Sequence, residues 1–128
     1  MKQHSPGFRA LCEDAASRVP ECSVEQILAE WKNPDKRVLI DVREQSEFGA
    51  GHVLGAIHLG KGVIERDVEQ QFPDKEQALV LYCGGGYRSL LAADALLRMG
   101  YRQVWSLAGG WRAWNAANGP VEKPAGPG

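Results

Sequence analysis

Residues 78–89, with the sequence ALVLYCGGGYRS, contain an apolar run, a cysteine and three consecutive glycines. The run at 78–82 is short, apolar almost throughout and free of glycine and proline, which is typical of a buried strand in a parallel sheet. After the glycines, apolar residues recur at helical spacing, at positions 90, 91, 95, 96 and 99. The stretch therefore predicts a strand, a tight glycine turn and a helix that Gly100 closes.

The same alternation continues on both sides of this stretch. Residues 37–42 and 104–107 are short apolar runs and are predicted as two further strands. Helices are predicted at residues 44–50, 63–72 and 110–117. Strands that alternate with helices indicate an α/β domain with a mostly parallel sheet.

The N-terminal part of the chain precedes this alternating pattern. Apolar residues at helical spacing predict a helix over about residues 7–19, which Pro20 ends. Ser23 and Gln26 have the spacing of a capping box at the start of a second helix. We therefore divide the chain into an N-terminal helical extension (1–20), a main domain (21–121) and a flexible tail rich in proline and glycine (122–128).

Composition restricts the classes of function. The 128 residues have a formal net charge of −1, so no basic excess indicates a nucleic-acid partner. No apolar run reaches the roughly 20 residues of a membrane helix, and the first residues lack the apolar stretch of a signal peptide. We therefore expect a cytoplasmic protein that binds neither nucleic acid nor membranes. Its three cysteines, Cys12, Cys22 and Cys83, form no C-x-x-C pair, which argues against a disulfide framework and a structural zinc site.

Cys83 stands at the carboxyl end of a predicted strand, the edge at which open α/β sheets bind ligands. Gly84, Gly85 and Gly86 allow several backbone N–H groups to turn toward one point, and such a nest attracts an anion. Arg88 adds a nearby cation, and a thiol beside a cation and a helix N-terminus ionises readily. A cysteine that only packs is the commoner case, but a packing turn rarely needs three glycines. The stretch thus predicts a nucleophilic Cys83.

The loop Cys83-Gly84-Gly85-Gly86-Tyr87-Arg88-Ser89 resembles the active-site loop of single-domain rhodaneses, which are thiosulfate sulfurtransferases. Residues 41–56 (DVREQSEFGAGHVLGA) resemble the first motif of that family, and Gly109-Gly110-Trp111 with Trp114 resembles its C-terminal signature. The likeness runs from about residue 23 to residue 121. It implies a rhodanese-like five-stranded parallel sheet with helices on both faces.

The resemblance also implies a reaction. The Cys83 thiolate takes a sulfane sulfur from thiosulfate or a persulfide, and a thiol acceptor then collects it. Cys83 would be the catalytic residue, and the residues implied for substrate and anion binding are Gly84, Gly85, Gly86, Tyr87, Arg88 and Ser89. No metal and no organic cofactor is implied. The implied partners are a small sulfur donor and a thiol acceptor, with a sulfur-relay protein as a further candidate.

One departure from the family pattern bears on the donor. Rhodaneses that use thiosulfate well often carry basic residues directly after the cysteine, where this chain has Gly84 and Gly85. Lys61 and Arg66 are candidates to supply positive charge from a neighbouring loop. A persulfide therefore stays open as the natural donor.

Asp41, Arg43 and His52 are candidate supporting residues, for which we favour structural roles. Asp41 is expected to bind backbone N–H groups, and Arg43 is expected to pair with Glu47 on the next turn. His52 lies in a glycine-flanked turn and is expected to hydrogen-bond there rather than act as a base.

Two other functions stay open beside the sulfurtransferase. Rhodanese-fold phosphatases and arsenate reductases have a similar loop with five residues between the cysteine and the arginine, whereas four lie between Cys83 and Arg88. A shorter loop makes a smaller pocket, which suits sulfur better than a tetrahedral phosphate. Non-catalytic binding modules of the fold usually lack the cysteine or have a degraded loop. Cys12 and Cys22 are most simply ordinary thiols, with sulfur acceptance as the alternative.

Overall fold

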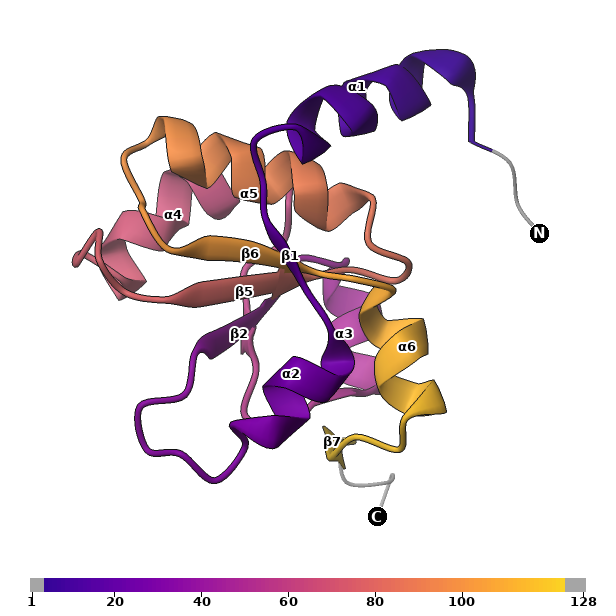
Figure 1. Cartoon of the computed structure of the whole chain (residues 1–128), viewed down its shortest axis with the longest axis vertical. Helices are drawn as coiled ribbons and strands as arrows, with labels where there is room; N and C mark the ends of the chain where they lie inside the picture. The colour runs from indigo at the N-terminus through magenta and orange to yellow at the C-terminus, as the bar shows by residue number, and fades with distance from the viewer. Residues whose placement is uncertain (1–3, 124–128) are drawn as a thin grey trace.

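The structure is a computed structural model that describes residues 4–123. Figure 1 shows a central sheet with helices on both sides. Five strands form this sheet in the order β1-β6-β5-β2-β4, and every neighbouring pair is parallel. The strands are β1 (Glu21–Cys22), β2 (Val38–Asp41), β4 (Ile57–His58), β5 (Leu79–Tyr82) and β6 (Val104–Leu107). The predicted α/β fold with a five-stranded parallel sheet is confirmed.

Helices cover both faces of the sheet (Figure 1). One face carries α1 (Pro6–Ala16), α4 (Ile64–Gln71) and α5 (Arg88–Arg98), and the other carries α2 (Val24–Ala29), α3 (Gln45–Ala50) and α6 (Gly110–Ala116). In the described part of the chain, no helix combines the length and the apolar character needed to span a membrane.

The core divides into two apolar clusters, one on each face of the sheet. The division follows from strand geometry, because successive side chains of a strand point to opposite faces. In β5, Leu79 and Leu81 join the cluster under α1, α4 and α5, whereas Val80 and Tyr82 join the opposite cluster. Cys83 continues this alternation and points into the first cluster. The register of β5 therefore decides which helices surround the Cys83 side chain.

The N-terminal helix is shorter than predicted. α1 ends at Ala16, with Ser17 as its C-cap, whereas the apolar spacing predicted a helix to residue 19. Val19 is nevertheless 4% exposed, because the segment after the helix still packs into the core. α1 lies against α5. Just after α1, Arg18 Nε is 2.8 Å from Asp94 Oδ1 of α5. The predicted extension therefore covers the same face of the sheet that Cys83 occupies.

A small antiparallel pair of strands was not predicted. β3 (His52–Val53) pairs with β7 (Val121–Glu122). Glu122, the first residue of the predicted tail, therefore belongs to a strand. Residues 124–128 of the predicted tail lie outside the described residues.

Candidate active site

Cys83 follows the carboxyl end of β5, and α5 begins at Arg88. The Cys83 side chain is 1% exposed. Its Sγ accepts a hydrogen bond from the Gly86 N–H at 3.1 Å and lies 3.5 Å from Ser89 Oγ. An N–H group that points at the sulfur is placed to stabilise negative charge there. The structure thus brings Cys83, Gly86 and Ser89 of the predicted loop together around one atom.

The beginning of α6 binds the other side of this loop. The Trp111 N–H donates to the Cys83 carbonyl at 2.7 Å, and the Arg112 N–H donates to the Gly84 carbonyl at 3.2 Å. These bonds hold the two carbonyls toward α6. Gly86 then turns its N–H toward the sulfur with a left-handed φ of +102°, which glycine adopts at little cost. The loop conformation therefore depends on α6 as well as on the glycines.

Two serines extend the polar contacts beside Cys83. Ser89 Oγ and Ser106 Oγ are 2.8 Å apart, and both side chains are 0% exposed. Each buried hydroxyl thus has a partner, as buried polar groups require. Sequence analysis placed Ser89 in the loop but missed Ser106, although a serine among the apolar residues of strand 104–107 was an available signal.

Tyr87 and Arg88 lie at the outer edge of the loop. Tyr87 is 43% exposed, and its ring centroid lies 6.3 Å from that of Phe8 on α1. Arg88 Nη1 is 3.3 Å from Glu47 Oε1 of α3. Partial burial opposes ionisation of Glu47, but hydrogen bonds from the Glu44 N–H and from Arg88 give its carboxyl a net lowered pKa. The charge of Arg88 is therefore shared with a carboxylate rather than held for Cys83 alone.

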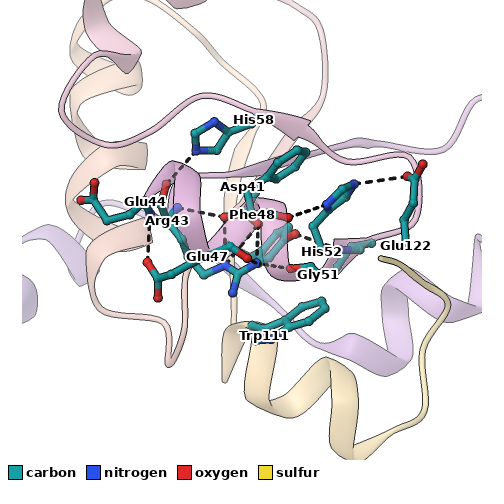
Figure 2. Close-up of polar contacts among 12 residues, drawn as sticks. Asp41, Arg43, Glu44, Glu47, Phe48, Gly51, His52, His58, Trp111 and Glu122 are labelled. Carbon is teal, nitrogen blue, oxygen red and sulfur yellow. Dashed lines mark hydrogen bonds and ion pairs between the residues drawn. The ribbon is translucent and has the colours of Figure 1, made fainter. Parts of the chain in front are cut away.

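Asp41 and Arg43 form a buried ion pair near the loop (Figure 2). Arg43 Nη2 is 2.8 Å from Asp41 Oδ2, and the side chains are 4% and 0% exposed. Asp41 Oδ1 also accepts a hydrogen bond from the Arg43 backbone N–H at 2.9 Å. The Arg43 guanidinium donates to the Gly51 carbonyl at 2.7 Å and lies 4.7 Å from the centroid of the Trp111 ring. The pair thus supports the end of α3 and the residue whose N–H binds the Cys83 carbonyl.

The predicted pairing of Arg43 with the Glu47 carboxylate is wrong. Arg43 reaches only the backbone carbonyl of Glu47, at 3.4 Å, and the Glu47 carboxylate binds Arg88. The reason is burial. The fully buried Asp41 carboxylate needs a charged partner more than the half-exposed Glu47 carboxylate does.

His52 connects α3 with β7 (Figure 2). Its Nδ1 lies 2.9 Å from the Phe48 carbonyl oxygen, and its Nε2 lies 3.2 Å from Glu122 Oε1. The ring also stacks on Phe48, with centroids 3.7 Å apart. These contacts give His52 a structural part in the wall behind the loop and leave no ring nitrogen directed at Cys83.

The chain also matches a known family over most of its length. The family model for the rhodanese-like domain matches residues 24–117. The chain belongs to the rhodanese-like domain family. The helix α1 of this rhodanese-like domain lies before the matched region.

Solved structures share this rhodanese-like fold. A protein of unknown function from Rhodopseudomonas palustris, called a possible tyrosine phosphatase, is 29% identical with a TM-score of 0.79, and the match covers 95% of this chain and 99% of that chain. The polysulfide-sulfur transferase of Wolinella succinogenes is 25% identical with a TM-score of 0.77, covering 94% and 90%. A thiosulfate sulfurtransferase from Pseudomonas aeruginosa is 22% identical with a TM-score of 0.81, covering 92% of this chain and 23% of that chain, and shows the fold alone.

Gly110 lets α6 of the rhodanese-like domain approach the loop closely. Its φ is +53°, and a Cβ at this position would overlap the Cys83 carbonyl and lie 3.1 Å from the Gly84 carbonyl carbon. We expect Gly110→Ala to lower the free energy of unfolding by about 2–4 kcal/mol, because the backbone is left-handed and the space is filled. Urea denaturation measures this, with Gly62→Ala as the matched control because the Cβ position of Gly62 is open. Equal stability of the two variants would contradict the close approach.

Cys12 and Cys22 are 2% and 3% exposed. Burial, with a smaller contribution from Cys83, raises the pKa of Cys12, and the charge of Lys61 opposes this rise. Burial raises the pKa of Cys22 to about 11. The Cys12 thiol lies 3.8 Å from the Tyr87 carbonyl oxygen, beside the loop. A raised pKa lowers the thiolate fraction of each group, which argues against sulfur acceptance by Cys12 or Cys22.

Arg88 was predicted as a cation beside the loop glycines, but a second cation there, Arg112, was not. A Cβ on Gly85 would lie 3.8 Å from Arg112 Nη1. Arg66, which the sequence suggested for this role, instead binds Asp67 with 2.7 Å between Nε and Oδ1. No local pattern marks Arg112, because α6 meets the loop only in the tertiary structure.

Within residues 4–123, no group of three or more His, Cys, Asp and Glu side chains is arranged to hold a metal ion.

Proposed function

We propose that this rhodanese-like domain is a sulfurtransferase that carries a sulfane sulfur as a persulfide on Cys83. The observation that carries the proposal is the position of Cys83 Sγ, which faces the Gly86 N–H at 3.1 Å at the carboxyl end of a central strand. A side chain that is 1% exposed suits attack on a narrow donor that presents a terminal sulfur. The loop N–H stabilises negative charge on the thiolate before the reaction and on the persulfide after it.

The reaction proceeds in two substitutions at sulfur. The Cys83 thiolate attacks the outer sulfur of thiosulfate, a new S–S bond forms, and the old S–S bond breaks so that sulfite leaves with the electron pair. A cyanide ion or a thiolate acceptor then attacks the outer sulfur of the Cys83 persulfide. The Cys83 thiolate leaves and is ready for another cycle. No net oxidation occurs, and the sequence of steps is ping-pong.

A phosphatase is the second candidate, since a similar structure is called a possible tyrosine phosphatase. Phosphoryl transfer needs cations and N–H groups directed at the equatorial oxygens of the phosphate. Here four residues separate Cys83 from Arg88, and the Arg88 guanidinium binds Glu47. Both features favour the sulfurtransferase, because they leave the loop short and its arginine partly neutralised.

The test is the intact mass of the protein after incubation with thiosulfate. We expect a gain of one sulfur atom, about 32 Da, that cyanide removes. A persulfide of a small thiol serves as a second donor, and an aryl phosphate serves as the phosphatase substrate. No added sulfur with either donor would contradict the proposal. Release of phosphate in that case would support the phosphatase, and inactivity with all three compounds would support a binding module.

A further inference from the structure

Two guanidinium groups lie against the glycines that follow Cys83. A Cβ on Gly84 would lie 3.5 Å from Arg88 Nη2, and a Cβ on Gly85 would lie 3.8 Å from Arg112 Nη1. Arg88 comes from α5 and Arg112 from α6, so the two groups approach the loop from different elements. At both distances a Cβ would be in ordinary van der Waals contact with the guanidinium, so the two groups lie directly against the loop backbone.

The two arginines differ in their partners. Arg88 is offset by the Glu47 carboxylate at 3.3 Å. Arg112 is exposed, and within the part of the chain that the structure describes its guanidinium has no ion pair with a carboxylate. Its backbone N–H is bonded to the Gly84 carbonyl at 3.2 Å, which fixes the base of the side chain to the loop. Arg112 is therefore an uncompensated positive charge held at the outer side of the Cys83 loop.

We propose that Arg112 determines specificity by binding the oxyanion end of a small dianionic sulfur donor of the thiosulfate class. This inference rests on the proposed sulfurtransferase function. A guanidinium binds a sulfonate group through two parallel N–H···O bonds and stays charged at any physiological pH. The proposal requires a donor that binds its sulfonate to Arg112 and directs its outer sulfur at Cys83. The same guanidinium stabilises the sulfite that leaves when the S–S bond breaks, because that product keeps the negative charge.

Binding by Arg112 should favour anionic sulfur donors over uncharged ones. A dianion gains Coulomb energy from Arg112, whereas the hydropersulfide of an uncharged thiol gains little. Replacing Arg112 should therefore change the use of thiosulfate more than the use of the uncharged donor. Sulfate, which has the same oxyanion geometry without a transferable sulfur, should compete for the same place.

The experiment compares Arg112→Gln with Arg102→Gln. Arg102 is 76% exposed and precedes β6, so it lies at the opposite edge of the sheet and controls for net charge. We expect Arg112→Gln to lower kcat/KM for thiosulfate about 5- to 20-fold through KM, with kcat nearly unchanged. It should weaken inhibition by sulfate to a similar extent. The variant Arg112→Lys, which keeps the charge, should recover part of the loss. For the hydropersulfide of 2-mercaptoethanol, kcat/KM should stay within about twofold.

The outcomes separate the two proposals. If the unaltered protein transfers sulfur and Arg112→Gln behaves like Arg102→Gln with thiosulfate, the role of Arg112 is wrong and the sulfurtransferase function stands. An equal loss with both donors would also overturn the role, because it would indicate a structural effect. If the unaltered protein transfers sulfur from neither donor, the proposed function itself fails and the inference falls with it.

Discussion

Replacing Cys83 by serine should lower sulfur transfer from thiosulfate to cyanide by about a thousandfold or more, because the group that forms the covalent intermediate is removed. The serine hydroxyl is somewhat smaller than the thiol but can also accept a hydrogen bond from the Gly86 N–H, so the loop around it should persist. A hydroxyl is far less nucleophilic toward sulfur than a thiolate at neutral pH. The measurement is the rate of thiocyanate formation, together with the intact mass after exposure to thiosulfate.

Cys22→Ser is the matched control for this variant. Cys22 is also buried, and burial raises its pKa to about 11, so it holds almost no thiolate at neutral pH. We expect the control to keep its activity within about twofold and to gain one sulfur in the mass measurement. Activity above about one hundredth of the original in Cys83→Ser, or equal losses in the two variants, would show that Cys83 is not the sulfur carrier.

Replacing Arg43 by methionine should lower the free energy of unfolding by about 3–5 kcal/mol, because it leaves the Asp41 carboxylate buried without a counter-ion. Asp41 is 0% exposed, so water does not replace the lost guanidinium. The variant also loses the hydrogen bond to the Gly51 carbonyl and the contact with the Trp111 ring. Urea denaturation at neutral pH measures the loss.

Arg66→Met is the matched control for the buried pair. The Arg66–Asp67 pair has the same chemistry, but its arginine is 73% exposed, and exposed pairs contribute at most about 1 kcal/mol. A second variant, Asp41→Asn combined with Arg43→Met, should recover part of the stability because no charge is left buried. If Arg43→Met loses no more stability than Arg66→Met, the buried pair does not hold this part of the domain together.

The longer elements of this domain were predictable from local sequence. Strands β2, β5 and β6 lie within the predicted runs, shorter by a residue or two at most. Each has enough consecutive apolar residues to show a pattern. Strands β1 and β4 have two residues each, which is too few for any periodicity, so the number of five strands came from the family resemblance. The predicted C-terminal end of α1 was residue 19, whereas the helix ends at Ala16. The apolar spacing misled the prediction because Val19 packs into the core from the segment that follows the helix.

The candidate site likewise has a part that local sequence predicted and a part that it did not. The Cys83 loop and Ser89 were found from sequence, because a strand, three glycines and a helix start within twelve consecutive residues, 78–89. The partner of Arg43 was predicted as Glu47 from helical spacing, but burial decided for Asp41.

By itself, the sequence determined the α/β class and the glycine turn after Cys83, and it predicted Cys83 as a nucleophile, because each of these rests on residues that are neighbours in the chain. Only the tertiary structure decided which groups surround the Cys83 side chain. Ser106 reaches Ser89 because β6 lies beside β5, and Arg112 reaches the loop because Gly110 leaves space for α6. The physical reason is that strand order and helix approach are set by burial and backbone pairing across the whole sheet, which no local pattern of residues encodes.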